Sequence, residues 1–278
     1  MSRARTSNEI WWARIVDRVD ELLHNYPKLP KKPLPENSDN KTGNVYIIGM
    51  TSLVHELVVT RLQAYFRAPN SGVDDHPPIY VTGQPFHYNP DGSGVQIAPD
   101  VAVYPNITFV PKPALSTVIP PPPSDKAGNP HARIICEVGV GQSVGYLKQK
   151  CESWMREQYV RAVVSIKILK PRSGIREPAT GYFYRTMTAK LYRQGIATQR
   201  WDFGNVKKNS TDPIRDPAPC NAPNLAHFQI NIPVGEVFWN PRFPVPPDYA
   251  PTVPPVVTVP NFTIDLYRIQ REALIAES

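Results

Sequence analysis

Cysteine is scarce in this chain of 278 residues, which has only three: Cys136, Cys151 and Cys220. The number is odd and no C-x-x-C pair occurs, so the sequence argues against a disulfide framework and a structural zinc site. Apolar runs are also short, because none approaches the ~20 residues that cross a membrane. The first residues, Met1–Ser7, lack the hydrophobic stretch of a secretory signal. We therefore expect an intracellular protein, cytoplasmic or nuclear, without a membrane partner.

Three common catalytic signatures are absent as well. The chain has no G-x-x-x-x-G-K-[ST] phosphate loop, no H-E-x-x-H zinc helix and no G-x-S-x-G nucleophile elbow. A glycine-rich turn, Gly139–Gly145, does lie between a predicted strand and a predicted helix, where a dinucleotide-binding fingerprint belongs. Its spacing is the looser G-x-G-x-x-x-G, and the next strand ends at Ile166–Lys170 without an acidic residue to hold a ribose. Dinucleotide binding stays an open alternative.

Proline is in excess, with 33 residues, and it is grouped rather than spread evenly. Proline-rich segments at 27–43, 105–130 and 241–260 are typical of extended loops and linkers. The chain is 41% hydrophobic overall, which is enough to build a core. We predict three parts: residues 1–43 form an N-terminal helix and a Pro/Lys-rich linker, residues 44–240 form the core domain, and residues 241–278 form a Pro-rich tail with a C-terminal helix.

Hydrophobic periodicity predicts the elements of the core. Helical spacing predicts helices over residues 52–67 and 143–159. Apolar and β-branched runs predict strands over residues 79–82, 95–104, 133–138, 161–169, 181–193, 196–203 and 228–232. A short helix at 234–238 and a final helix at 265–277 follow. The strand, helix and strand between residues 133 and 169 imply a crossover between parallel strands. The expected fold class is α+β (mixed α/β), with a central mixed sheet flanked by helices and Pro-rich arms.

Two acidic residues stand where apolar, β-branched runs meet a break. Asp100 directly precedes the run Val101–Tyr104, and Glu137 lies within Ile134–Gly139. Carboxylates at neighbouring strand ends can share one divalent cation. A carboxylate inside a strand is also seldom buried unless it is paired or bound to metal. We therefore single out Asp100 and Glu137 as a candidate metal site.

In this order the motifs resemble the PD-(D/E)XK nuclease superfamily, and within it the Uma family of restriction-endonuclease-like proteins. The resemblance covers about residues 51–240 and rests on His55, Pro99-Asp100, Glu137 with Ser143 shortly after, Lys150 four residues before Trp154, and the closing segment 230–238. It implies a restriction-endonuclease-like core and a metal-dependent endonuclease that hydrolyses the phosphodiester bonds of nucleic acid. We expect DNA before RNA as the partner, and the sequence leaves the choice between them open. The resemblance also implies Mg²⁺ or Mn²⁺ as cofactor, with Asp100, Glu137 and the Val138 carbonyl as ligands.

The sequence departs from the superfamily pattern at one position, because the lysine of D/E-x-K falls on Gly139. Another cation would have to orient the attacking water or offset the charge that builds on the phosphate. Lys148 and Lys150 point roughly 200° apart on the predicted helix, so only one of them can face the site. The spacing to Trp154 favours Lys150, as in the Uma pattern.

Three further residues lie near this candidate site in the sequence. Gln142 precedes the predicted helix, where it could position a water or a phosphate. Glu56 could supply a third carboxylate to the metal. His55 is most simply a histidine of a polar network or of the packing. A fold that has lost catalysis would also fit these residues, so the alternative function is an inactive nuclease-fold module that binds nucleic acid or protein.

Positive charge is concentrated in one segment. Residues 161–208 contain eleven Lys or Arg against two acidic residues, which gives 11 − 2 = +9 and exceeds the +7 of the whole chain. Aromatic residues are interleaved with these charges, as on surfaces that hold a polyanionic backbone and stack on bases. The candidate nucleic-acid-binding residues are Lys167, Lys170, Arg172, Arg185, Lys190 and Arg193. A solvated sheet face is an equally open interpretation, and a homodimer is a further expectation.

Overall fold

The computed structural model describes residues 52–88, 96–111, 124–172, 174–210, 212, 216–242 and 244–276. All of these residues belong to one compact unit, Thr51–Ser278. The predicted N-terminal helix and linker in residues 1–43 lie outside the described residues, as do residues 112–123 of the predicted proline-rich loop. Within the described part, no helix combines the length and the apolar character that crossing a membrane requires.

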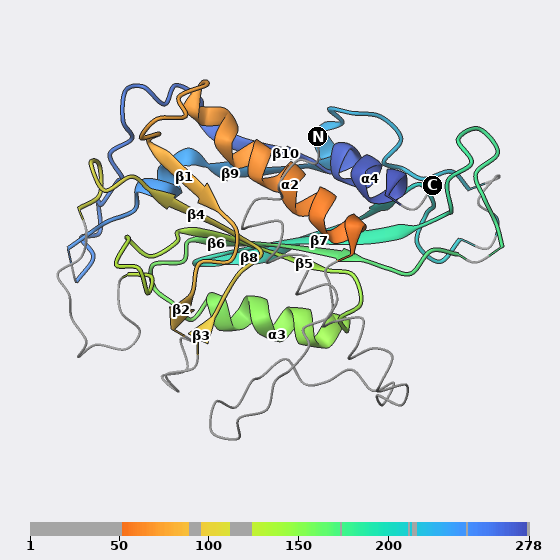
Figure 1. Ribbon diagram of the computed structural model, residues 1–278, viewed down its shortest axis with the longest axis horizontal. Coiled ribbons are helices and arrows are strands. Elements are labelled where there is room, and N and C mark those ends of the chain that lie inside the picture. Colours follow the sequence, from red (N-terminus) through yellow and green to blue (C-terminus); the bar gives the residue numbers. More distant parts are fainter. Residues whose placement is uncertain are drawn as a thin grey trace, which may run out of the picture. The chain divides into compact units, whose positions relative to one another are not determined.

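A six-stranded mixed sheet forms the centre of the unit, with the strand order β1-β4-β5-β6-β7-β8 (Figure 1). Its strands are β1 (Ile79–Thr82), β4 (Val101–Pro105), β5 (Ile134–Gly139), β6 (Ala162–Ile168), β7 (Thr186–Arg193) and β8 (Ile196–Gly204). β5 and β6 run parallel, and the other neighbouring pairs are antiparallel. β4, β5 and β6 are buried along their whole length, as expected for strands covered on both faces. The predicted α+β class with a mixed central sheet is confirmed.

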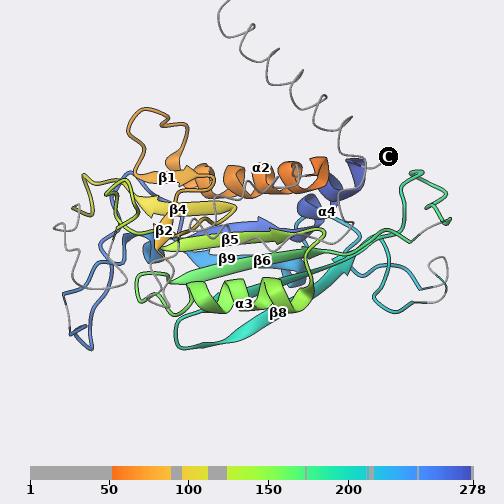
Figure 2. The same ribbon diagram turned by 60° about the horizontal axis from the view of Figure 1, so that its bottom comes forward.

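Helices cover both faces of this sheet. α2 (Leu53–Arg67) and α4 (Leu266–Ile275) lie on one face, and α3 (Val144–Trp154) lies on the other (Figures 1 and 2). α2 begins where the Ser52 hydroxyl accepts a hydrogen bond from the His55 N–H, which satisfies one of the free donors of the first turn. Short 3₁₀ helices occupy η1 (Ala68–Asn70), η2 (Ala226–Phe228) and η3 (Val234–Phe238).

Two small antiparallel pairs complete the unit. β2 (His87–Tyr88) pairs with β3 (Gln96–Ile97), and β9 (Gln229–Pro233) pairs with β10 (Asn261–Asp265). The single strand predicted over residues 95–104 is therefore two strands, β3 and β4, which are separated by residues 98–100.

The C-terminal segment is part of the core rather than an arm beyond residue 240. The ring of Phe262 on β10 lies 5.0 Å from that of Phe66 on α2, and Ile264 is fully buried. α4 packs along α2. The prediction of a separate tail and helix over residues 241–278 does not describe this arrangement, because the apolar side chains of β10 and α4 are buried against α2.

The sheet separates two buried apolar clusters, and this separation positions the acids. The larger cluster fills the space between the sheet, α2, α4 and the β9–β10 pair, and the smaller one lies under α3. Along β5, Cys136 and Val138 point into the larger cluster and Ile135 into the smaller. Because strand side chains alternate between faces, Glu137 points toward α3.

Candidate active site

Asp100 and Glu137 meet where β4 begins and β5 ends. The antiparallel register pairs Val101 with Cys136, so Asp100 lies directly beyond the last rung of the ladder. Its Oδ2 accepts a hydrogen bond of 2.7 Å from the Val138 N–H. The Asp100 carboxylate thus takes the place of a strand partner and is fixed beside the end of β5.

The carboxylate of Glu137 is buried and accepts hydrogen bonds at both oxygens. Trp154 Nε1 donates to Oε1 at 2.6 Å, and Lys150 Nζ lies 2.9 Å from Oε2. Lys150 and Trp154 are four residues apart on α3 and therefore share one face of the helix. Lys148 points elsewhere, since its ammonium is exposed and pairs with Glu152 at 3.6 Å. Of the two predicted lysines, the structure brings Lys150 to the acids.

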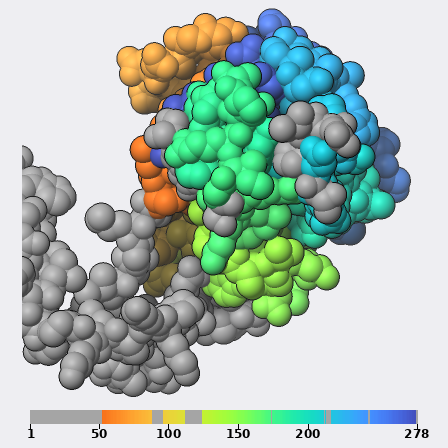
Figure 3. Space-filling model, turned by 90° about the vertical axis from the view of Figure 1, so that its right-hand side faces the viewer, coloured from red at the N-terminus to blue at the C-terminus, as the bar shows by residue number. Residues whose placement is uncertain are grey.

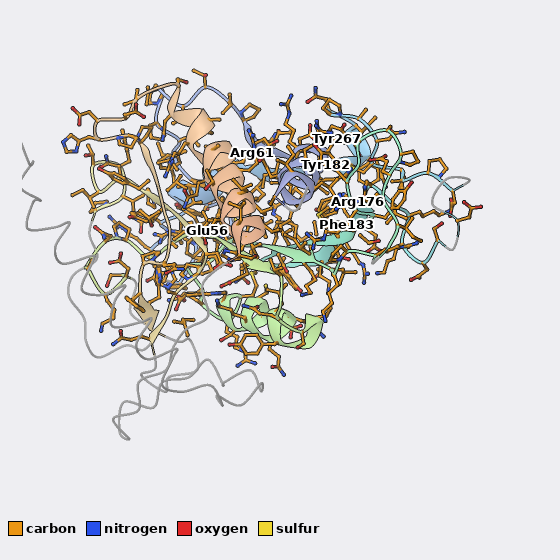
Figure 4. The ribbon with its side chains drawn as sticks, turned by 45° about the vertical axis from the view of Figure 1, so that its right-hand side comes forward. Glu56, Arg61, Arg176, Tyr182, Phe183 and Tyr267 are labelled. Carbon is orange, nitrogen blue, oxygen red and sulfur yellow. The ribbon has the colours of Figure 1, made fainter. Side chains whose placement is uncertain are left out.

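His55 brings α2 to the site from the opposite face of the sheet. Its Nε2 lies 3.3 Å from Asp100 Oδ1, and its Nδ1 lies 3.1 Å from Glu56 Oε1. Figure 4 labels Glu56 at the N-terminal end of α2. Within the described residues, no group of three or more His, Cys, Asp and Glu side chains is arranged to hold a metal. Glu56 therefore reaches Asp100 through His55 rather than as a third carboxylate beside the other two.

Burial dominates the electrostatics of Glu137 and raises its pKa to about 7. The charge of Lys150 opposes this shift, and the negative charge of Asp100 adds to it. Burial alone would lower the pKa of Lys150, but the charges of Glu137 and Asp100 outweigh it and raise that pKa. Burial would likewise raise the pKa of Asp100, yet the hydrogen bonds from His55 and the Val138 N–H help to lower it. At neutral pH the site therefore holds the Lys150 ammonium beside the ionised Asp100 carboxylate, whereas Glu137 takes up or releases its proton at about pH 7.

The donor atoms at this end of the sheet suit a hard divalent cation. The N–H and C=O of one strand residue point to the same edge, so the Val138 carbonyl faces the edge at which Asp100 lies. Mg²⁺ and Mn²⁺ prefer oxygen ligands, and Mg²⁺ is commonly held by one or two carboxylates while it keeps several waters. Each oxygen of Glu137 retains a second lone pair besides the one that accepts a hydrogen bond. The residues present thus fit the predicted ion.

Gly139, the last residue of β5, stands in closely packed surroundings. A Cβ at this position would lie 3.0 Å from Leu147 Cδ2 and 3.6 Å from the Cδ of Lys167, which is opposite Gly139 on β6. Lys167 is buried, and its ammonium donates to the carbonyls of Val140 and Gln142 at 2.8 and 2.5 Å. The side-chain oxygen of Gln142 is buried in the same turn and has no hydrogen-bond partner among the described residues. A packed turn therefore follows directly after Gly139.

The predicted basic surface is largely engaged within the protein. Lys167 and Arg185 are buried, and the Arg185 guanidinium donates to the Ala273 carbonyl. Arg193 pairs with Glu236 at 3.0 Å, and Arg172 donates to the carbonyls of Ser210 and Lys207. Lys170 is exposed and Lys190 is half-buried on β7. The prediction of six residues on one binding face is wrong for Lys167 and Arg185, because their side chains are inside the fold.

Sequence reasoning missed two contacts of the site. Trp154 served only as a spacing marker for Lys150, although its indole N–H binds Glu137 directly. The sequence predicts His55 only as a histidine of the packing or of a polar network, and the structure shows that Asp100 belongs to that network. The Trp154 contact could have been inferred, since a residue four positions from Lys150 shares its helix face. The His55 contact could not, because it joins two elements that are distant in sequence.

Two buried histidines lie behind Trp154. The rings of His87 and His131 are 4.4 Å apart, and that of His87 meets Trp154 edge-on at 5.6 Å. Nδ1 of His87 bonds the Pro85 carbonyl and Nδ1 of His131 bonds the Ala132 carbonyl, at 2.9 and 2.8 Å. These contacts place the proton of each neutral ring on Nδ1. Burial lowers the pKa of both histidines, and that of His131 falls well below 6.5.

Acid is therefore expected to destabilise the wild-type protein relative to a His131→Phe variant. The native state keeps His131 neutral, whereas in the unfolded chain this histidine takes up a proton near pH 6.5. The neutral ring therefore favours the folded wild-type protein fully above pH 6.5, and this contribution to its unfolding free energy is lost as the pH falls below 6.5. The unfolding free energy of the wild type minus that of His131→Phe should fall by about 1.4 kcal/mol per pH unit below pH 6.5. Urea unfolding from pH 8 to pH 5 measures it. A parallel pH dependence of the two proteins would contradict the assignment of a neutral, buried ring.

Comparison with known proteins found no family model that matches the chain and no curated protein that matches its sequence. The fold and the site together define an α+β protein in which two carboxylates and one ammonium meet at the end of a mixed sheet.

Proposed function

We propose that this protein is a metal-dependent endonuclease that hydrolyses phosphodiester bonds of nucleic acid, with DNA as the preferred substrate. One observation carries the proposal: Asp100 and Glu137 meet at one end of the sheet, and Lys150 from α3 supplies the ammonium that Gly139 does not. The resemblance to the PD-(D/E)XK superfamily and its Uma family supports the same function, including a restriction-endonuclease-like core. The charges and donor types, rather than the fold alone, are the reason for the assignment.

The residues divide the chemistry among themselves. Asp100, Glu137 and the Val138 carbonyl would hold Mg²⁺ or Mn²⁺, which supplies an activated water and offsets charge on the phosphate when bound. Lys150 donates hydrogen bonds toward the attacking water or toward a phosphate oxygen, because its ammonium already stands beside Glu137. His55 orients the Asp100 carboxylate from the α2 side. The Trp154 N–H fixes the rotamer of Glu137.

A second candidate function follows from the hydrogen bonds that Glu137 already accepts within the protein. Trp154 and Lys150 already donate to both of its oxygens, so the carboxylate is satisfied within the protein. An inactive nuclease-fold module that binds nucleic acid or protein would keep such a pair for stability alone. The two functions differ in one property, since only the endonuclease requires the acids to bind a divalent ion.

Lys150→Met is expected to lower the cleavage rate by about 10²-fold, because the ammonium near the phosphate is lost. Lys148→Met is the matched control and should stay within about twofold of the wild type, since Lys148 is exposed and pairs with Glu152. The measurement is single-turnover cleavage of supercoiled, duplex and single-stranded DNA and of RNA in Mg²⁺ or Mn²⁺, with EDTA as a blank. Equal losses in both variants would argue against Lys150 as the active-site cation. Wild-type protein that cleaves none of these substrates would favour the inactive module.

A further inference from the structure

Two hollows adjoin on α4, outside the acidic site. Each has a volume of about 190 Å³, and both are lined by Tyr267 and Arg271. These residues are four positions apart on α4, so they share one face of the helix. Figure 3 shows this end of the molecule, where the green segment ahead of β7 lies beside the blue segments of the C-terminal third. The two hollows are therefore neighbours on this face of α4, and we call them together the groove.

The first hollow is aromatic. Tyr182, Tyr184 and Tyr267 line it, and Figure 4 labels Tyr182 and Tyr267. The Arg271 guanidinium lies over the Tyr182 ring, 5.5 Å from its centroid. Asn205 fixes this wall, since it accepts a hydrogen bond from the Arg185 N–H and donates to the Phe183 carbonyl. These two bonds hold the main chain on both sides of Tyr184 in place.

The second hollow is lined mainly by arginine: Arg61, Arg268 and Arg271, with Glu272 as its carboxylate. Arg61 forms an ion pair with Glu272, and Arg268 lies 3.6 Å from Asp265. Within the described residues, Arg271 makes no ion pair with a carboxylate. It therefore carries the positive charge in excess, at the junction of the two hollows.

One carboxylate also lines the first hollow. Glu177 accepts a hydrogen bond of 2.6 Å from the Thr180 hydroxyl, which engages one of its oxygens. A carboxylate at this position repels a phosphate but accepts hydrogen bonds from amino groups such as those of nucleobases. The charge of the groove thus favours an anion at Arg271 and a neutral, hydrogen-bonding ring beyond it.

We infer that this groove binds one unpaired nucleotide of a nucleic-acid strand, with its base on Tyr182 in the first hollow and its phosphate at Arg271. Sites that enclose a drug-sized ligand start at ~300 Å³, so each hollow admits a ring or a phosphate but not a whole nucleotide. Bases of a duplex are stacked and paired, whereas an unpaired base offers its face to an aromatic side chain. The inference rests on the proposed function for its substrate and specifies that substrate as single-stranded.

The groove also lies close to the acids along α2. Arg61 is six residues from His55, which corresponds to about 9 Å along the helix axis, and His55 contacts Asp100 at 3.3 Å. The helix α2 therefore borders both the second hollow, through Arg61, and the acidic site, through His55.

The test is the affinity of the full chain in EDTA for a fluorescently labelled single strand, measured by anisotropy over a salt series. Tyr182→Leu should weaken binding by about 5-fold to 100-fold, and Tyr182→Phe should retain it, because stacking needs the ring alone. Arg271→Gln should weaken binding about tenfold and reduce the salt slope by about 1. Arg156→Gln is the matched control, since this exposed arginine follows α3 on the opposite face of the sheet, and it should stay within about twofold.

Three further ligands in the same titration show whether the groove binds an unpaired nucleotide within a strand, a duplex or a free nucleotide. An intact duplex and an abasic strand should bind the wild type more weakly than the normal strand, and a free mononucleotide should compete only at far higher concentration. Equal affinity for duplex and single strand would overturn the inference, as would a mononucleotide that binds as tightly as the strand. Thermal unfolding of each variant checks that it is folded, and unchanged binding by a folded Tyr182→Leu variant also overturns the inference.

Different results would overturn the proposed groove and the proposed endonuclease. Protein that binds a single strand through Tyr182 and Arg271 but never cleaves it would overturn the proposed endonuclease and leave the groove intact. Protein that cleaves through Glu137 but binds equally well after Arg271→Gln would overturn the groove and leave the endonuclease intact.

Discussion

Glu137→Gln is expected to reduce Mg²⁺- or Mn²⁺-dependent cleavage by about 10³-fold or more, because it removes a charged metal ligand and keeps the shape of the side chain. The amide oxygen can still accept the Trp154 N–H, so the packing under α3 should persist. Lys150 lies partly exposed and can turn toward solvent when its ionic partner is lost. The measurement is single-turnover cleavage, together with calorimetric titration of Mn²⁺.

Glu157→Gln is the matched control for this substitution. Glu157 is also buried in the turn after α3, and burial raises its pKa to about 7, as it does for Glu137. It accepts the Tyr159 N–H rather than a bond from Lys150. The control should therefore share the stability change of removing a buried acid but keep cleavage and Mn²⁺ affinity. Wild-type cleavage by Glu137→Gln, or cleavage that survives EDTA, would argue against the proposed endonuclease.

Gly204→Ala is expected to cost about 3 kcal/mol of unfolding free energy. Gly204 ends β8 with φ at 133°, and an added Cβ would lie 2.1 Å from the Arg185 carbonyl oxygen. The main chain must move to relieve this overlap, which disturbs the pairing with Thr186 and the hydrogen bond from the Gly204 N–H to Gln270. The expected result is a lower urea midpoint with an unchanged slope.

Gly195→Ala is the control for backbone conformation alone. Gly195 joins β7 to β8 with φ at 71°, and an added Cβ would have no neighbour within 4 Å. It should therefore cost only about 1 kcal/mol. Similar losses at the two positions would show that the close approach to Arg185 does not determine the stability of this hairpin.

Local patterns were sufficient to predict the parts of the site that lie on one element. Helical periodicity separates Lys150 from Lys148, and the apolar run around Glu137 places this acid on a buried strand. The order of β5, α3 and β6 follows from strand and helix signals that succeed one another along the chain. These features depend on neighbours within one element or on directly successive elements, which the sequence displays.

Contacts between distant segments could not be predicted in this way. The strand β10 could not be predicted from the sequence, because the proline-rich segment before it is typical of a tail. Its strand conformation depends on pairing with β9. The net charge of residues 161–208 indicated a binding face, but Glu236 pairs with both Arg161 and Arg193 from outside that segment. A charge count along the chain cannot show which charges are neutralised by residues elsewhere in the fold.

Because Lys150 lies on the helix α3, it can leave the site while the rest of the protein stays folded. α3 buries only three side chains: Leu147, Cys151 and Trp154. A local opening of this one helix would carry Lys150 and Trp154 away from Glu137 while the sheet, α2 and α4 kept their shared core. The helix amides would then exchange with solvent at a lower free energy than those of the central strands. The proposed endonuclease activity would then be lost reversibly under conditions milder than those that unfold the protein.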